Sequence, residues 1–196
     1  MSAGARIPLD DALPIAAAIA EALAPGCERI EIAGSIRRRR ADVGDIEILA
    51  IPRIHTEQIA DGLFDTRDVA IDELQLSLDL ALADGLLASH PLDPKRGPKY
   101  AKLVHAGSGI QVDLFSTRPE TWGVAFLIRT GPAEYSERFV TEIKRRNWHI
   151  GRGCELHVGG LKCDDRMSPC EAVATPDEAD VARLTGWHLV PPAMRA

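Results

Sequence analysis

The chain has 196 residues, of which 45% are hydrophobic, so it can build one larger domain or two small domains around a real core. Its formal net charge of −6 excludes a general nucleic-acid coating protein, in which net positive charge supplies the affinity for phosphate. It has no apolar run of membrane-spanning length and no signal-peptide pattern, so we expect a cytoplasmic protein whose four cysteines are free thiols.

The first predicted helix covers residues 9 to 23. An aspartate (Asp10 or Asp11) can cap it, a proline lies in its first turn, and apolar residues recur at helical spacing. A Pro-Gly pair at residues 25–26 ends it. Residues 29 to 32 then alternate polar and apolar side chains, which predicts a half-buried strand.

A second strand, from residue 43 to 51, carries two carboxylates. Because strand side chains alternate between faces, Asp45 and Glu47 point to one side while Ile46 and Ile48 point to the other. Two neighbouring carboxylates repel each other unless a cation lies between them, and oxygen-ligated Mg²⁺ is the natural choice. The pattern therefore predicts a metal site on this strand.

A turn and a basic segment separate these two strands. Gly34 allows close approach to a phosphate because it has no side chain, and a backbone N–H, the Ser35 hydroxyl and the arginines at 37–40 can donate hydrogen bonds to phosphate oxygens. Turn, basic segment and carboxylate strand together predict a metal–triphosphate site. The alternative interpretation is an ordinary strand with solvated acids beside a solvated basic loop.

Residues 66 to 83 are predicted to form a helix that covers the sheet, because apolar residues recur on one side. A loop with four cations follows, among them Lys95, Lys99 and Lys102, and leads into a short strand. This loop is either a solvated surface or a contact for a nucleic-acid backbone.

A further strand, from residue 110 to 115, places Asp113 on the face opposite to its apolar residues. If this strand pairs beside the Asp45 strand, Asp113 becomes a third carboxylate at the same metal site, as a two-metal displacement requires. The alternative is a surface aspartate.

The remainder of the chain is predicted to be mainly helical, after a domain boundary near residues 117–119. The predicted elements are a helix at 116–128, a helix at 133–146, a small hairpin within 148–163, and a helix at 174–184 capped by Thr175. Cys154, His157, Cys163 and Cys170 are zinc-binding residue types, but their spacing is not that of a zinc motif, and we do not expect zinc.

Several of these motifs resemble one known family. Gly34-Ser35-x-Arg37-Arg38, followed by Val43-Gly44-Asp45-Ile46-Glu47, resembles the nucleotidyltransferase palm of the DNA polymerase X family. Residues 111–115, Trp122-Gly123, Thr130-Gly131 and Pro191-Pro192-x-x-Arg195 also fall in that family's order. The family usually has aspartate at the position of Glu47, whereas related nucleotidyltransferases use an Asp-x-Glu pair.

The resemblance implies an α+β fold in two parts. Residues 1–117 would form a nucleotidyltransferase palm, with a mixed or antiparallel sheet, covering helices and an N-terminal lead-in helix. Residues 118–196 would form a small α/β thumb-like subdomain. The family's helix–hairpin–helix repeats and lyase domain would have to precede residue 1, so a partner protein could replace them.

The resemblance also implies the site residues. Asp45, Glu47 and Asp113 would be catalytic and would bind two Mg²⁺ ions, for which Mn²⁺ could substitute. The nucleotide would be bound by Gly34, Ser35, Arg38, Gly44, Arg129, Thr130 and Gly131, and DNA by Lys95, Lys99 and Lys102. The family has a cis peptide bond after the Thr-Gly bend, so we expect a cis Gly131–Pro132 bond.

The predicted function is a reduced family X DNA polymerase. It would add nucleotides from a (d)NTP to the 3′-hydroxyl of a DNA primer on a template and release pyrophosphate, in DNA repair or in phage or mobile-element DNA synthesis. Two alternatives remain open: a nucleotidyltransferase of the toxin–antitoxin type that modifies RNA, protein or a small molecule, or a catalytically idle DNA-binding module.

Overall fold

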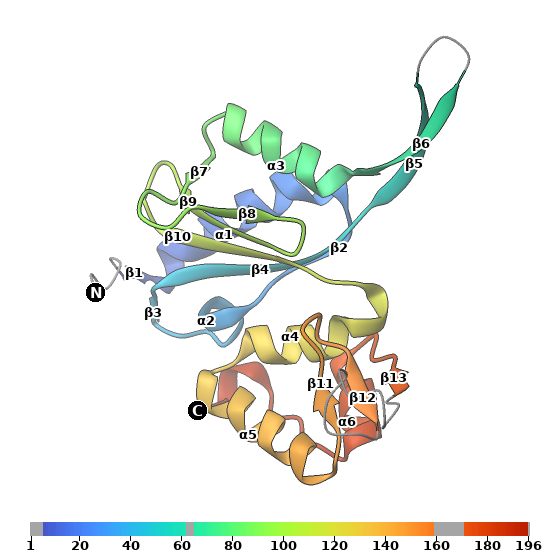
Figure 1. Ribbon diagram of the computed structural model, residues 1–196. Coiled ribbons are helices and arrows are strands. Elements are labelled where there is room, and N and C mark those ends of the chain that lie inside the picture. The colour runs from blue at the N-terminus through green and yellow to red at the C-terminus, as the bar shows by residue number, and fades with distance from the viewer. Residues whose placement is uncertain (1–5, 62–64, 159–170, 196) are drawn as a thin grey trace.

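The computed structural model describes residues 6–61, 65–158 and 171–195 (Figure 1). Its centre is a six-stranded sheet in which strands are ordered β2-β4-β10-β9-β7, with β8 also paired to β9. The β4–β10 pair is parallel and the other pairs are antiparallel, so the sheet is mixed and the fold is α+β. The strands are β2 (Cys27–Ile32), β4 (Asp45–Pro52), β7 (Leu87–Ser89), β8 (Lys95–Gly97), β9 (Tyr100–His105) and β10 (Gln111–Ser116).

Two helices cover one face of this sheet, α1 (Leu9–Leu23) and α3 (Glu73–Ala83) (Figure 1). The largest core cluster lies between them and the sheet and includes Ile46, Ile48 and Val112, which are fully buried. The predicted bounds of α1 are confirmed. The short strand β1 (Ile7–Pro8) precedes α1 and pairs with β3 (Asp42–Val43). The 3-10 turn η1 (Ala24–Gly26) follows α1.

The opposite face of the sheet is only partly covered. The helix α4 (Trp122–Thr130) packs on it through a smaller cluster that joins Leu49 and Ile51 of β4 to Trp122 and Phe126. A one-turn helix, α2 (Gly34–Arg37), lies beside α4. The first half of β4 extends beyond this cluster, and its outward side chains on this face are Asp45 and Glu47.

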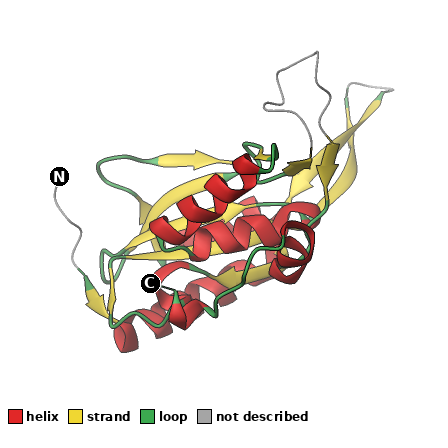
Figure 2. Cartoon of the chain, turned by 90° about the horizontal axis from the view of Figure 1, so that it is seen from below, coloured by secondary structure: helices red, strands yellow, loops and turns green. Residues whose placement is uncertain are grey.

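The C-terminal part has a core of its own, built around Tyr135, Phe139 and Val181. It contains η2 (Pro119–Thr121), α4, α5 (Ala133–Arg145), β11 (His149–Ile150), β12 (Leu156–Val158), β13 (Glu171–Val173), α6 (Glu178–Thr185) and η3 (Pro192–Met194). The helix predicted at 133–146 and the hairpin predicted after residue 148 are confirmed. Figure 2 shows this part from below the sheet.

The prediction of one helix over residues 66–83 is wrong in its first half. Residues 66–72 form β6 (Thr66–Asp72), which pairs with β5 (Ile54–Ala60) in a hairpin that projects from the body (Figure 1). The helix begins only at Glu73, where Asp72 accepts a hydrogen bond from the Gln75 backbone N–H at 3.2 Å. Pairing with β5, which local spacing does not reveal, decides the conformation of this segment.

Two helix starts in the C-terminal part also differ from prediction. Ser116 is the last residue of β10, and α4 begins only at Trp122. The last helix begins at Glu178 and is capped by Asp177 rather than Thr175. The Thr175 backbone N–H donates to the Glu120 carbonyl at 2.7 Å and its hydroxyl donates to the same carbonyl at 3.4 Å, so Thr175 joins this segment to η2 instead.

Cys27 and Cys154 are free thiols as expected, while Cys163 and Cys170 lie outside the described residues. Among the described residues, no helix combines the length and the apolar character needed to cross a membrane.

Candidate functional site: three carboxylates beside a basic pocket

The sheet brings the three predicted carboxylates together. Because β10 pairs with β4 in parallel, Asp113 lies opposite Glu47 and Gln111 lies opposite Asp45. Side chains at paired positions share a face, so Asp45, Glu47 and Asp113 all project from the face that α4 leaves partly open. The predicted pairing of the two strands is therefore confirmed.

The electrostatics of this cluster favour a cation. Burial, which has the largest effect, and the charges of Asp45 and Asp113 together raise the pKa of Glu47 to about 7, against the opposing effect of Arg129 and Arg38. Burial and the charge of Asp113 also raise the pKa of Asp45. Ionisation of Glu47 and of Asp45 is thus made more costly by the neighbouring carboxylates, and a bound cation would relieve that cost.

Asp113 is held in place by two hydrogen bonds. The Tyr100 hydroxyl donates to its Oδ1 at 2.7 Å and the Gln111 amide Nε2 donates to its Oδ2 at 2.9 Å. Within residues 6–61, 65–158 and 171–195, no three Asp, Glu, His or Cys side chains are arranged as a metal site. The three carboxylates nevertheless suit Mg²⁺ chemically, because they offer only oxygen ligands and lie on one face of the sheet. To bind a metal ion, Asp113 would give up one of its two hydrogen bonds.

A basic pocket of about 560 Å³ adjoins the carboxylates. It is lined by three arginines, Arg6, Arg38 and Arg40, by two aspartates, Asp42 and Asp45, and by Ser35, Ala41 and Gly44. The Ser35 hydroxyl and the Arg38 Nε are buried and have no hydrogen-bond partner among the described residues. Buried donors left without acceptors are costly, so this pocket is built to receive an anion rich in oxygen.

Arg6 is a residue of this pocket that the sequence analysis missed. It comes from the segment before β1, about forty positions from Asp45, and reaches the pocket because β1 pairs with β3. Its guanidinium lies over Gly44, where an added Cβ would be 3.8 Å from the arginine Cζ. This distance is an ordinary van der Waals contact, so Arg6 packs directly against the Gly44 backbone in the pocket.

Gly34 lies directly against one carboxylate of the cluster. It adopts φ +60°, a conformation that favours glycine, and a Cβ at this position would collide with the Glu47 carboxylate. It does not line the basic pocket. Gly34 therefore permits the close approach of the Glu47 carboxylate, and Ser35 is the residue of this pair that lines the basic pocket.

The predicted bend at Thr130-Gly131 borders a second pocket of about 420 Å³, which also contains Arg38, Glu47 and Arg129. The Gly131–Pro132 bond is cis, as expected. Thr130 is fully buried; its hydroxyl accepts from Arg37 at 2.5 Å and its carbonyl accepts from Arg38. Thr130 therefore supports the two arginines, while Arg129 and Gly131 line the pocket itself.

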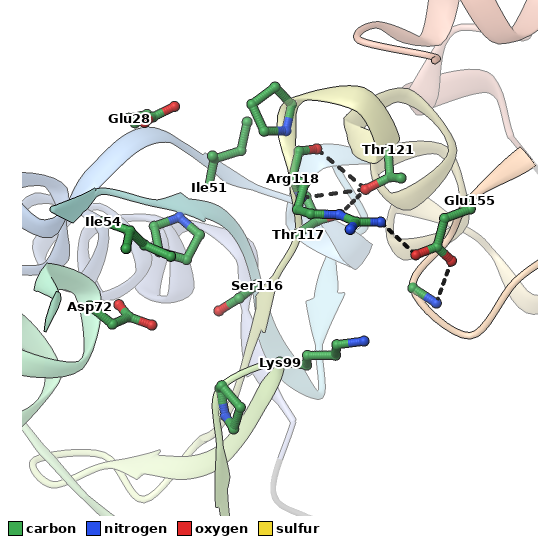
Figure 3. Close-up of a pocket in the computed structure, with 14 residues that line it drawn as sticks. Glu28, Ile51, Ile54, Asp72, Lys99, Ser116, Thr117, Arg118, Thr121 and Glu155 are labelled. Atoms are coloured by element: carbon green, nitrogen blue, oxygen red, sulfur yellow. Dashed lines mark hydrogen bonds and ion pairs between the residues drawn. The ribbon is translucent and has the colours of Figure 1, made fainter. Parts of the chain in front are cut away.

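The three lysines predicted to bind DNA do not form one patch. Lys102 lies opposite Asp113 in the β9–β10 pair, but both Lys102 and Lys95 are bridged to Asp93, at 3.2 and 3.1 Å. Lys99 lines a separate pocket of about 380 Å³, shown in Figure 3.

That separate pocket lies at the other end of β4 and β10, where Ile51 and Ser116 contribute to its wall (Figure 3). Ile51 lies four residues after Glu47 along β4, a distance of about 13 Å at the usual rise per residue. Of the three lysines, only Lys102 is placed directly beside a carboxylate of the cluster.

No protein-family model matches the chain, and no curated protein sequence is similar to it. The interpretation of the site consequently depends on its geometry. A carboxylate cluster that favours a cation, joined to a pocket that favours a phosphate-like anion, can bind a metal-associated polyphosphate.

Proposed function

We propose that this protein is a nucleotidyltransferase of the DNA polymerase X type, which adds a nucleotide from a (d)NTP to a nucleic-acid 3′-hydroxyl and releases pyrophosphate. The observation that carries the proposal is the β4–β10 register, which sets Asp45, Glu47 and Asp113 on one face beside the basic pocket. The resemblance of the motifs at residues 34–47 and 111–115 supports the same function.

The basic pocket would hold the triphosphate. Ser35 and Arg38 have buried donors without acceptors among the described residues, and Arg6 adds a third donor group. Phosphate oxygens would satisfy these donors through charge-assisted hydrogen bonds. The neighbouring pocket, lined by Arg129 and Gly131, would then take the sugar.

Asp45, Glu47 and Asp113 would hold two Mg²⁺ ions, or Mn²⁺ in their place. When bound, the ions would supply charge that neutralises the triphosphate and lowers the pKa of the attacking hydroxyl. Most of the catalysis would consist of positioning and electrostatic stabilisation.

Asp113 would act nearest to the attacking group. The 3′-hydroxyl oxygen forms a bond to the α-phosphorus, the bond from that phosphorus to pyrophosphate breaks, and the hydroxyl proton passes to the Asp113 carboxylate. Tyr100 and Gln111 would orient this carboxylate through the hydrogen bonds that they make in the structure.

The two-part organisation fits this proposal. Residues 1–117 would be the palm that carries the carboxylates, and residues 118–196 the thumb. In support, the sheet and the C-terminal part have separate core clusters, joined by the smaller cluster around Leu49, Trp122 and Phe126.

A primer-extension assay tests the proposal. Labelled primers, with and without a template strand, are incubated with each dNTP and NTP in Mg²⁺ or Mn²⁺, and the products are separated by length. We expect elongated primers with the wild type and none with Asp113→Asn. If the wild type leaves every primer unchanged while hydrolysing or transferring no nucleotide, the enzyme assignment is wrong.

A second candidate, transfer of a nucleotide to a protein or small molecule, is favoured by one observation. Lys95 and Lys102 are both engaged by Asp93, and Arg96 pairs with Asp79 at 2.7 Å, so the basic loop is largely neutralised within the protein. Incubation with α-labelled NTPs and cell extract, followed by detection of labelled protein, distinguishes this acceptor class from DNA.

A further inference from the structure

The basic pocket contains one arginine that the proposed function does not yet use. Arg40 lies on the wall formed by residues 40–42, between α2 and β3. The backbone of this wall is fixed at both ends: the Arg40 N–H donates to the Ser35 carbonyl at 3.0 Å, and the Ala41 carbonyl accepts from the Leu9 N–H at 2.9 Å. Arg40 therefore projects from a defined position on the pocket wall.

The Arg40 side chain is also tied to the far end of the chain. Its Nη2 donates to the Arg195 main-chain carbonyl at 3.1 Å. Arg195 is itself buried and donates to the Val190 carbonyl at 2.9 Å and to Glu178 at 3.0 Å. A guanidinium has five N–H donors, so this single bond orients Arg40 and leaves donors for a ligand.

Arg38 lines both the basic pocket and the neighbouring pocket that contains Glu47, whereas Arg40 lines the basic pocket and not the neighbouring one. Burial lowers the pKa of Arg38, and among its charged neighbours Glu47 and Asp45 raise it while Arg40 and Arg195 lower it. Asp45 and Arg38 therefore belong to the part of the pocket that adjoins the carboxylate cluster, and Arg40 belongs to the wall that it forms with Ala41 and Asp42. A phosphate chain whose reacting phosphate lies near the carboxylates would extend past Arg38 and finish at Arg40.

We infer that Arg40 binds the terminal phosphate of the triphosphate and makes the pocket selective for three linked phosphates over two. This inference rests on the proposed function, because it takes the reacting phosphate to lie at Asp45. A diphosphate placed in the same way would reach Arg38 and stop short of Arg40. Arg40 would therefore contribute little to its affinity.

The experiment uses inorganic tripolyphosphate and pyrophosphate as probes, so that no base or sugar contributes. Titration calorimetry at one fixed ionic strength measures both affinities for the wild type, Arg40→Gln, Arg40→Lys and the control Arg39→Asn. Arg39 is the exposed neighbour at φ 56°, which asparagine tolerates, so the control removes the same charge without touching the pocket lining.

We expect Arg40→Gln to weaken tripolyphosphate binding about tenfold and pyrophosphate binding by less than about twofold, as loss of one charge-assisted contact implies. Arg40→Lys should retain part of the selectivity, and Arg39→Asn should leave the ratio of the two affinities unchanged. Equal weakening of both probes by Arg40→Gln, or no weakening, would overturn the inference, since Arg40 would then contribute only general charge or nothing.

Failure of this inference can be told apart from failure of the proposed function. If the wild type extends primers but Arg40→Gln keeps the wild-type ratio of affinities, only the role of Arg40 is wrong. If tripolyphosphate selectivity depends on Arg40 but no nucleotide is transferred, the role of Arg40 stands and the reaction is wrong. If the wild type binds neither probe and extends no primer, both are wrong; if it extends primers but binds neither probe, only the inference on Arg40 is wrong.

Discussion

When no metal is present, ionisation of Glu47 should lower the free energy of unfolding by a measurable amount. Its carboxylate is largely buried and lies beside two other carboxylates, which together raise its pKa from an ordinary value of 4.5 to about 7. Glu47→Gln keeps the size of the side chain and removes the charge. In buffer containing EDTA, this variant should therefore be more stable than the wild type at neutral and alkaline pH.

The size and direction of the effect follow from the shift in pKa. Below pH 4.5 the carboxyl is protonated in both the folded and the unfolded chain, so it adds no cost. Between pH 4.5 and 7 only the unfolded chain ionises, and the wild type loses stability at about 1.4 kcal/mol per pH unit. Above pH 7 the loss is complete, at about 3–4 kcal/mol.

Urea unfolding of the wild type and Glu47→Gln at pH 5, 6, 7 and 8.5 measures this difference. Glu31→Gln is the matched control, because Glu31 lies exposed on β2, next to β4 in the sheet, and its substitution should change stability little at any pH. Adding Mg²⁺ at pH 8.5 should stabilise the wild type more than Glu47→Gln. A stability difference between the two proteins that does not change with pH would refute the reasoning.

Three further substitutions test the site and its support. Asp113→Asn should abolish nucleotide transfer in the primer-extension assay. The affinity for NTP, measured by calorimetry, should stay within about threefold of the wild type, because the basic pocket is intact. Normal extension by this variant would remove Asp113 from the mechanism. Gly34→Ala should lower the free energy of unfolding by more than Gly109→Ala does. Both glycines have positive φ, but of the two only Gly34 has a neighbour that an added Cβ would meet, the Glu47 carboxylate. Equal losses in urea unfolding would contradict this expectation. Glu178→Ala should lower the free energy of unfolding by about 3 kcal/mol, because it leaves the buried Arg195 without its carboxylate. Arg183→Ala removes an exposed ion pair with Asp180 and should lower it by less than about 1 kcal/mol. Equal melting temperatures for the two variants would show that the buried pair contributes no more than the exposed pair.

The sequence by itself determined the elements that carry the carboxylates. Alternation of polar and apolar residues located β4 and β10 and set Asp45 and Glu47 on one face, because strand periodicity is a local property of the chain. Helical spacing and the Pro-Gly pair after it located α1 with its observed bounds for the same reason. The grouping of Asp113 with the other two carboxylates was a prediction that the β4–β10 register confirmed.

Tertiary structure alone decided which residues surround that cluster. Residues 66–72 look helical by spacing and form a strand because β5 pairs with them. Arg6 reaches the basic pocket only through the pairing of β1 with β3, and Arg40 is oriented by the carbonyl of Arg195, 155 positions away. The predicted DNA-binding lysines are likewise divided between two places by the course of β8 and β9. Contacts between distant segments depend on strand order and packing, and neither can be predicted from the spacing of residues along one segment.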